Sequence, residues 1–350
     1  MSELRARGLR VGLYTSPHLV SPCERMTVND VPISEAAFAE WATLLKPHIE
    51  RTGASFFEAT TAMALADFAA RGVDVAVIEV GLGGRLDATN VITPLVSVVT
   101  KIALEHTEYL GTDLKGIARE KAGIAKPRVP FVTGEPDAEL RAEIMREAER
   151  RGAAPIVAVD IRRTPPAGTV LGLRGPHQVA NAWVAAGALK QLPSGALPQG
   201  PPIGEEIPAS FGDAYIPARF DVRGKWIFDV AHNPDGMRVL VEALSSHGAP
   251  RPLHALVGIR NDKDWRPMLE LLAPAVDRLV LTVPPSIPVM QRWSVSDVSG
   301  GDVRRGALIE PDFDTALREV QDGAATVLVT GSFHTVGDAL SRLPGFAPVG

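Results

Sequence analysis

A glutamate and three glycines at the end of an apolar run form the first candidate site. Glu79 lies near the end of the run 73–80, and Gly81, Gly83 and Gly84 follow it. A buried carboxylate is costly unless it is paired or binds a metal ion, and glycines let the backbone approach a ligand closely. The alternative is a plain strand-to-loop turn with a salt-bridged glutamate. The glycine spacing excludes the dinucleotide-binding pattern G-x-G-x-x-G.

A histidine beside acidic residues forms the second candidate site. His106 follows the predicted strand 96–100, within Glu105-His106-Thr107-Glu108. In a parallel sheet this loop lies at the same edge as Glu79. An imidazole and a carboxylate can complete an octahedral shell for Mg²⁺ or Mn²⁺, with water and phosphate oxygens as the other ligands. Taken alone, a single histidine is more often only a hydrogen-bonded loop residue.

Four further side chains suit nucleotide or phosphate binding, and each has an ordinary structural alternative. Lys121 lies in a charged helix terminus at 119–124. Gln178 and Asn181 have the i, i+3 spacing of one helix face, where their amides could contact a purine edge or simply cap and cross-link. Arg219 lies where a linker rich in proline and glycine ends, in a position to clamp a phosphate.

The segment 229–236 has the order strand, polar loop, helix. Asp229 and His232 lie at the end of the predicted strand and in the loop. Asn233 suits the N-cap of the helix and Pro234 suits its first position. The ordinary interpretation of this segment is a well-capped helix.

The elements that must position these residues alternate between strand and helix. The run 73–80 is rich in β-branched residues, which predicts a parallel strand buried on both faces. Other strands are predicted at 9–14, 96–100, 130–133, 155–158, 225–230, 253–257, 278–282 and 326–330, with helices from 34, 57, 115, 137, 177, 234, 265 and 335. This alternation predicts parallel sheets with right-handed crossovers. Prolines and glycines cluster between 192 and 217, so we expect domains at 1–212 and 220–350 joined by a linker at 213–219.

Composition excludes several classes of protein. The chain has 350 residues, 45% hydrophobic and 22% charged, with a net charge of −5. Such a balance is typical of a globular protein and argues against general nucleic-acid binding. The one cysteine, Cys23, excludes an internal disulfide framework or a multi-cysteine zinc site. No apolar run is long enough for a membrane span or signal peptide, so we expect a cytoplasmic protein without a membrane partner.

Taken in order along the chain, these motifs resemble the folylpolyglutamate synthase/dihydrofolate synthase family, a branch of the Mur ligase superfamily. The matching segments are Tyr14-Thr15-Ser16-Pro17-His18-Leu19, Glu24-Arg25, Phe57-Glu58, 79–90, Glu105-His106-Thr107, 119–124, His177-Gln178 with Asn181, Arg219, 229–234, Asp262-Lys263-Asp264 and 330–334. Each segment is weak alone, but the ordered set covers almost the whole chain and is specific. The resemblance implies an α/β fold of two domains: an N-terminal P-loop-type, mostly parallel sheet flanked by helices, and a C-terminal Rossmann-like domain.

The resemblance also implies a reaction and its site residues. Family members use ATP to join L-glutamate to a folate or dihydropteroate carboxylate through an acyl phosphate, so the partners are these three molecules, and a monomer is implied. Chemistry of this type depends on placing anions together and neutralising the charge that develops. Lys121 corresponds to a lysine that is carbamylated and then faces the second of two Mg²⁺ ions.

The implied metal-binding residues are Ser16, Glu79, His106 and Lys121. The implied ATP-binding residues are Gln178, Asn181, Arg219, Asp229 and His232. The implied substrate-binding residues are Ser16, Pro17, His18, Phe57, Asp87, Ala88 and His334. The implied catalytic residues are Glu79, His106, Lys121 and Arg219.

The sequence departs from the family pattern at one major point. The family has a P-loop of the type G-T-N-G-K-G-S before the Thr15-Ser16-Pro17-His18 segment, and no G-x-x-x-x-G-K-[ST] pattern occurs in these 350 residues. We therefore expect the first strand, the loop and its helix to be absent, the neighbouring strands to have unpaired edges, and ATP binding to be weak. The stretch 161–173 also looks short.

Because the downstream site residues are all present, we expect the true start to lie upstream. The alternatives are an inactive relative that binds folate without ATP turnover, and a Mur-type ligase that acts on a cell-wall precursor.

Overall fold

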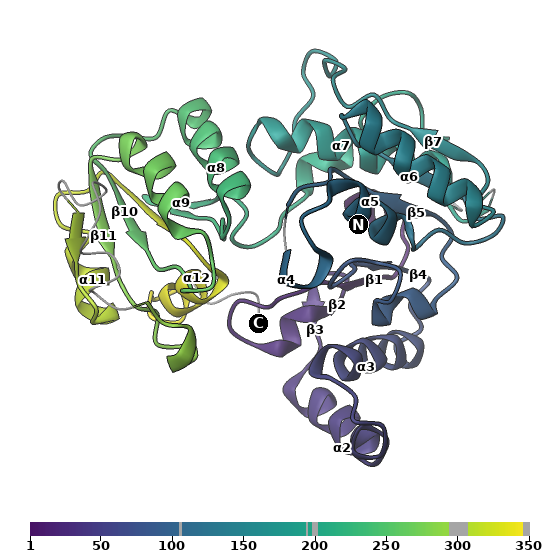
Figure 1. Ribbon diagram of the computed structural model, residues 1–350, viewed down its shortest axis with the longest axis horizontal. Helices are drawn as coiled ribbons and strands as arrows, with labels where there is room; N and C mark the ends of the chain where they lie inside the picture. The colour runs from purple at the N-terminus through teal and green to yellow at the C-terminus, as the bar shows by residue number, and fades with distance from the viewer. Residues whose placement is uncertain (105–106, 194, 198–201, 294–306, 346–350) are drawn as a thin grey trace. The chain divides into compact units, whose positions relative to one another are not determined.

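The computed structural model describes residues 1–350 apart from 105–106, 194, 198–201, 294–306 and 346–350 (Figure 1). The chain divides into two compact units. The first comprises Met1–Gly172 and Val179–Ala214, and the second comprises Leu173–Gln178 and Tyr215–Gly350. Each unit combines strands with flanking helices, so the two-domain α/β class expected from the sequence is confirmed. No helix in the described ranges is long and apolar enough to cross a bilayer.

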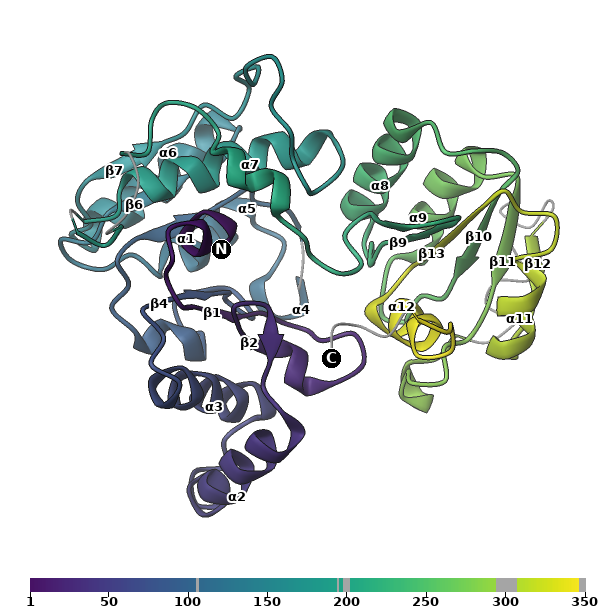
Figure 2. The same ribbon diagram turned by 180° about the vertical axis from the view of Figure 1, so that it is seen from behind.

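The first unit contains two separate sheets. Its elements are α1 (Ser2–Ala6), β1 (Val11–Tyr14), β2 (Met26–Val28), β3 (Val31–Pro32), α2 (Glu35–Thr52), α3 (Phe56–Ala70), β4 (Val75–Ile78), β5 (Ser97–Val99), α4 (Thr107–Leu110), α5 (Leu114–Ala122), β6 (Phe131–Thr133), α6 (Ala138–Arg150) and β7 (Ile156–Ala158). One sheet has the order β3-β2-β1-β4 and the other has the order β5-β6-β7. Figure 2 shows α3 beside the first sheet and α6 beside the second. Helix α7 (Pro176–Lys190) begins in the second unit and continues into the first.

Strand β4 is the clearest departure from the sequence prediction. It pairs with β1 in parallel, with Leu13 opposite Val77, and no strand in the described residues pairs with its other side. Ala76 and Val77 are exposed, and the Val77 side chain keeps 37% of its accessible surface. The prediction of a strand buried on both faces is therefore wrong. The β-branched composition was compatible with burial, but burial of a strand also requires other elements to pack on its faces.

In the part of the second unit that the structure describes, six strands form one continuous sheet. Its elements are β8 (Asp221–Arg223), β9 (Trp226–Phe228), α8 (Pro234–His247), β10 (Leu253–Val257), α9 (Trp265–Leu272), β11 (Arg278–Leu281), β12 (Ala307–Ile309), α11 (Phe313–Glu319), β13 (Thr326–Thr330) and α12 (Phe333–Leu340). The order is β12-β11-β10-β13-β9-β8, and every pair except β8 with β9 is parallel. The predicted strands 253–257 and 326–330 match β10 and β13 residue for residue.

Helices cover the two faces of this six-stranded sheet. On one face, Met237 and Leu240 of α8 and Met268 of α9 form a buried cluster with alternate strand residues such as Ala255 and Leu328. Because side chains alternate along a strand, the intervening residues project to the opposite face, where α11 and α12 pack. All five residues of β10 and all five of β13 are buried as a result.

Candidate functional site

In the first unit, Glu79 lies at the carboxyl end of β4 and contacts the loop that follows β1. The backbone N–H of Ser16 donates to Oε2 of Glu79 over 2.8 Å. The two residues are 63 positions apart in the sequence, and the parallel pairing of Tyr14 with Ile78 brings them together. Two of the residues expected to bind metal, Ser16 and Glu79, therefore meet where β1 and β4 end. The sequence argument instead placed Glu79 at one sheet edge with the loop after the strand at 96–100. In the described residues that strand, β5, belongs to the separate sheet β5-β6-β7, so the expected shared sheet is not found.

The glycine-rich loop after Glu79 is held by Asp87. Oδ2 of Asp87 accepts hydrogen bonds from the N–H groups of Gly81 and Leu82 over 3.1 and 2.9 Å. Its Oδ1 accepts from the Thr89 N–H over 2.9 Å and from the Thr89 hydroxyl. A carboxylate that accepts four hydrogen bonds fixes the shape of the loop. The structure thus gives Asp87, an expected pterin-site residue, a role in building the loop.

The same loop packs directly on the end of α5, where Lys121 lies. A Cβ atom on Gly84 would come within 2.9 Å of the carbonyl oxygens of both Glu120 and Lys121. The Arg85 N–H also donates to the Glu120 carbonyl, and the Arg85 Nε donates to Oε1 of Glu120, each over 2.9 Å. Only glycine permits this close approach. The loop that carries Glu79 and the helix turn that carries Lys121 are therefore built as one piece.

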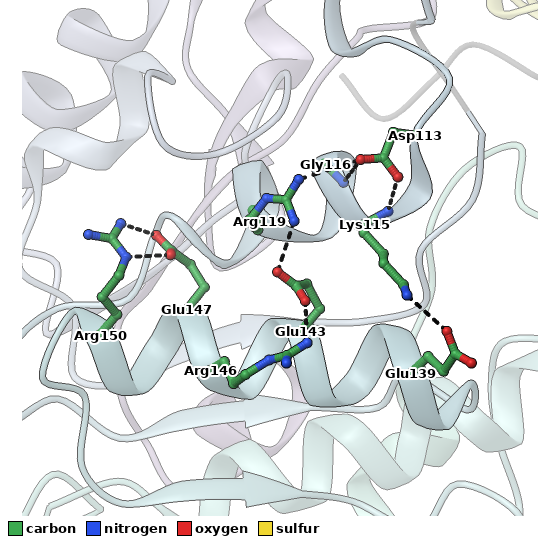
Figure 3. Close-up of polar contacts among 9 residues, drawn as sticks. All are labelled: Asp113, Lys115, Gly116, Arg119, Glu139, Glu143, Arg146, Glu147 and Arg150. Carbon is green, nitrogen blue, oxygen red and sulfur yellow. Dashed lines mark hydrogen bonds and ion pairs between the residues drawn. The ribbon is translucent and has the colours of Figure 1, made fainter.

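Ion pairs hold α5 against α6 (Figure 3). Arg119 donates to Oε1 of Glu143 over 2.9 Å, and Lys115 lies 2.9 Å from Oε2 of Glu139. The Arg119 hydrogen bond lowers the pKa of Glu143, which also pairs with Arg146. Asp113 caps the first turn of α5 through the N–H groups of Lys115 and Gly116. These contacts fix the orientation of α5 and therefore the position of its last turn, which contains Lys121.

An aromatic wall lies beneath the glycine loop. The ring of Phe57 lies 5.9 Å from the ring of Tyr14, and a Cβ on Gly81 would come within 2.4 Å of Phe57 Cζ. The Tyr14 hydroxyl is 3.0 Å from the Thr60 hydroxyl and 3.1 Å from the Thr61 hydroxyl, both on α3. Phe57, expected near the pterin, is therefore placed beside the loop that starts at Glu79.

In the second unit, Asp229 lies at the end of β9 and is partly buried. Its Oδ2 accepts from the Phe220 N–H over 2.8 Å and its Oδ1 accepts from the Ala231 N–H over 2.9 Å. Burial raises the pKa of Asp229 above its usual range, while these two N–H groups and the Arg219 charge oppose that shift. The carboxylate draws together the segment before β8 and the loop after β9.

Arg219 and His232 converge on Phe333. The Arg219 guanidinium carbon lies 5.6 Å from the centre of the Phe333 ring, a cation–π distance. The His232 ring lies 5.8 Å from the same ring, and its Nδ1 is 2.9 Å from the Val230 carbonyl oxygen. Two expected ATP-binding residues from different segments therefore share one aromatic support.

The backbone on either side of Arg219 is strained. Ala218 and Phe220 have φ values of 60° and 49°, in the left-handed region that non-glycine residues rarely adopt. Such conformations persist only where the surrounding structure enforces them. Here the Asp229 carboxylate accepts a hydrogen bond from the Phe220 N–H, which helps to hold this backbone.

The Arg219 charge also acts on His177 of the same unit. Burial and this nearby charge lower the pKa of His177.

His334 belongs to a different cluster of the second unit. Its Nδ1 is 2.9 Å from the Ser286 hydroxyl, which donates to Oδ2 of Asp338 over 2.9 Å. Burial and the Arg260 charge lower the pKa of His334, and Asp338 opposes them. Arg260 is itself held by two hydrogen bonds to Asp262, each of 3.0 Å.

The remaining expected residues have mixed outcomes. His106 lies outside the described residues. Gln178 and Asn181 lie on α7 as predicted, but Gln178 is buried and Asn181 is exposed. Asn233 caps α8 by accepting from the Gly236 N–H over 2.7 Å, as its sequence position predicted. In the described ranges, no group of three or more histidine, cysteine, aspartate or glutamate side chains is arranged to hold a metal ion.

Sequence reasoning gave no role to several residues that the fold places in these clusters. Phe333 supports Arg219 and His232, and Ser286 and Asp338 contact His334. Ser286 is 48 positions from His334. No spacing rule could have found it, because β11 and β13 end at one edge of the sheet only after folding. The family resemblance includes Arg25 in a matching segment but assigns it no function.

Known proteins of one family are similar to this chain over almost its whole length. The Mur ligase glutamate ligase domain matches residues 218–333. The Escherichia coli dihydrofolate synthase/folylpolyglutamate synthase is 32% identical over 375 residues, which cover 97% of this chain and 81% of that protein. This chain belongs to the folylpolyglutamate synthase/dihydrofolate synthase family. It spans 44% of a longer relative, a probable bifunctional folylpolyglutamate synthase/dihydropteroate synthase from Halobacterium salinarum, at 34% identity.

Solved members of the family have the same fold. The E. coli FolC structure in complex with DHPP and ADP superposes with a TM-score of 0.80 at 30% identity, covering 97% of this chain and 83% of that one. The Yersinia pestis bifunctional enzyme complexed with AMPPNP and a manganese ion gives a TM-score of 0.81 at 32% identity, with the same coverage of both chains. The expected family membership is thus confirmed on sequence and on fold.

Proposed function

We propose that this protein is an ATP- and Mg²⁺-dependent ligase that adds L-glutamate to folate, to dihydropteroate, or to both. The observation that carries the proposal is the match to the E. coli dihydrofolate synthase/folylpolyglutamate synthase over 97% of the chain. The substrate carboxylate takes the γ-phosphoryl group of ATP to give an acyl phosphate. The glutamate amine then attacks the acyl carbon, an amide bond forms, and phosphate leaves.

The donor atoms of the first unit suit magnesium. Glu79 and the Ser16 hydroxyl are oxygen ligands, which Mg²⁺ prefers. Because the Ser16 N–H already orients one Glu79 oxygen, the carboxylate has a defined direction. An unmodified Lys121 ammonium would repel the dication, so we propose that Lys121 is carbamylated and that His106 completes the set of metal ligands. These residues would hold Mg²⁺, which would supply the positive charge that neutralises the phosphates.

The second unit supplies the nucleotide and glutamate groups in this proposal. Arg219 carries a charge suited to the γ-phosphate, and Phe333 restrains its guanidinium. A His232 Nδ1–H donating to the Val230 carbonyl leaves Nε2 as an acceptor for a nucleotide hydroxyl or amine. Asp229, Gln178 and Asn181 complete the ATP contacts, and the His334 cluster lies toward the glutamate.

Phe57, Pro17, His18, Asp87 and Ala88 border the pterin in this proposal. The aromatic wall under Gly81 suits stacking on a flat ring. We further propose that the protein is a cytoplasmic monomer that binds neither membranes nor nucleic acid. We place its domain linker at 213–219, close to the division at Ala214 and Tyr215.

Glutamate incorporation is the decisive experiment. The chain is incubated with ATP, Mg²⁺, labelled glutamate and either dihydropteroate or tetrahydrofolate, and the products are separated by mass. The Glu79→Gln variant is expected to lose metal-dependent turnover by at least about 100-fold while its circular dichroism is unchanged. Glu50→Gln, on exposed α2, is the matched control. Full activity of Glu79→Gln would disprove the metal assignment, and a panel that includes a Mur precursor tests substrate class.

A second candidate function is folate binding without ATP turnover. It rests on the absence of a G-x-x-x-x-G-K-[ST] pattern from the 350 residues. This candidate predicts that the chain binds a pteroate ligand but neither binds ATP tightly nor hydrolyses it. Isothermal titration with ATP and Mg²⁺ separates the two candidates, since submicromolar ATP affinity would rule out the second.

A further inference from the structure

A glutamate clamp makes the loop between β1 and β2 rigid. Oε1 and Oε2 of Glu24 accept hydrogen bonds from the backbone N–H groups of Leu19, Val20 and Ser21 over 2.8, 2.9 and 2.7 Å. The Ser21 hydroxyl caps the short helix Pro22–Arg25 in return. One carboxylate thus fixes three successive amides. The segment that carries His18 is therefore held from its far end by Glu24.

Arg25, the next residue, contacts His18 directly. Its Nε donates to His18 Nδ1 over 2.9 Å. A guanidinium has only donors, so the lone pair of this hydrogen bond must belong to the imidazole. A neutral imidazole that accepts at Nδ1 carries its proton at Nε2. The contact therefore determines which ring nitrogen of His18 is the donor.

The surroundings of the Arg25 side chain keep it in position to donate to Nδ1 of His18. It is 8% exposed, and its guanidinium carbon lies 5.2 Å from the centre of the Phe56 ring. The Arg25 carbonyl accepts from the Thr15 N–H over 2.9 Å, which ties its backbone to the end of β1. A buried, stacked arginine with a fixed backbone has few alternative rotamers.

We propose that Arg25 is a positioning residue that fixes His18 as the Nε2–H tautomer, so that His18 recognises a hydrogen-bond acceptor of the folate substrate. The suitable ligand atoms are a carbonyl oxygen or an unprotonated ring nitrogen, and a ligand donor is disfavoured at this position. The substrate part of this proposal rests on the proposed function. The tautomer part rests only on the Arg25–His18 contact.

The chain contains internal references for this assignment. His232 and His254 each have Nδ1 within 3.0 Å of a backbone carbonyl oxygen, which can only accept. Their Nδ1 atoms must therefore be donors, opposite to that of His18. A single labelled sample thus contains both tautomers.

Nitrogen-15 correlation spectra of histidine-labelled full-length protein at neutral pH test the tautomer. The His18 signal, assigned by its loss in His18→Gln, is expected to show a protonated Nε2 and an unprotonated Nδ1. Arg25→Met should abolish this preference, whereas Arg25→Gln, which keeps a donor, should retain part of it. A protonated Nδ1 at His18 in the unsubstituted protein would overturn the proposal, whether or not the Arg25 variants fold.

Binding of dihydropteroate, followed by its fluorescence, tests the substrate part. Glutamine places its amide nitrogen near the Nε2 position and asparagine places its nitrogen near Nδ1. We expect His18→Gln to bind within about threefold of the unsubstituted protein, and His18→Asn and Arg25→Met to bind about tenfold more weakly, as for one lost hydrogen bond. Equal weakening in His18→Gln and His18→Asn would overturn it. Absence of any pteroate binding by the unsubstituted protein would instead count against the proposed function, and the spectra would still decide the tautomer.

Discussion

Strands β4 and β13 have nearly the same composition but very different surroundings. Both are short parallel strands rich in β-branched residues, Val75–Ile78 and Thr326–Thr330. Strand β13 lies between β10 and β9, and each of its residues is buried. Strand β4 pairs only with β1 among the described residues, and Val77 remains 37% exposed. Composition alone therefore does not decide whether such a strand is buried, because burial depends on the elements packed around it.

The two strand ends also differ in how they are held. In the second unit, the loops after β9 and β13 follow strands that are paired on both sides, and the Asp229 carboxylate adds a hydrogen bond from the Phe220 N–H. In the first unit, the loop after β4 depends on Asp87 and on its close contact with α5. The expected metal site thus relies on loop hydrogen bonds rather than on sheet continuity.

The largest effect is expected when a valine of β13 is replaced by alanine and compared with the same replacement on β4. Val329→Ala removes two methyl groups from a residue that is 0% exposed, so we expect a loss of about 2–3 kcal/mol in unfolding free energy. Val77→Ala makes the same chemical change on the β4 edge, and a loss below about 1 kcal/mol is expected. Native-state hydrogen exchange measures the opening of each strand separately. Equal losses of unfolding free energy in the two variants would mean that β4 is covered in solution, and the contrast between β4 and β13 would be wrong.

The next effect concerns the contact between the glycine loop and α5. Alanine at Gly84 would place Cβ 2.9 Å from two backbone carbonyl oxygens that cannot easily move. We expect Gly84→Ala to cost about 1–3 kcal/mol and to speed hydrogen exchange in residues 81–90. Gly204→Ala is the control, because its nearest neighbour would be 4.0 Å away. Unchanged exchange in Gly84→Ala would show that the loop does not depend on α5.

The smallest expected effect concerns the ion pairs that Glu147 of α6 forms with Arg150 and Arg151. Hydrogen bonds from Arg150, then from Arg151, lower the pKa of Glu147 despite its burial. Because the folded pKa is the lower one, the stabilisation is present above the unfolded pKa of about 4.3 and is lost as the pH falls through the folded value.

We therefore expect Glu147→Gln to reduce stability by roughly 0.5–1 kcal/mol at pH 7 and by little at pH 3. The effect is limited because the Arg150 side chain is 68% exposed. Glu149→Gln, on the same helix and exposed, is the control and should have no measurable effect. Urea unfolding at the two pH values measures both variants, and a pH-independent loss in Glu147→Gln would contradict the electrostatic explanation.

Much of the fold followed from local sequence rules. Asn233 and Pro234 started α8 where capping chemistry predicted, and β10 and β13 matched their apolar runs. The position of Glu79 and its glycine loop at a strand end was also foreseeable from the apolar run that precedes them. These features depend on neighbouring residues in the chain, which a sequence displays directly.

The sequence by itself determined the alternation of elements, the helix caps and the candidate side chains at strand ends. Tertiary structure alone decided that Ala76 and Val77 of β4 are exposed, that Ser286 contacts His334 across 48 residues, and that Arg25 donates to the ring of His18. The physical reason is that capping and periodicity act over one or two turns. Burial, hydrogen-bond partners and tautomers depend on groups that only the folded chain brings within a few ångströms.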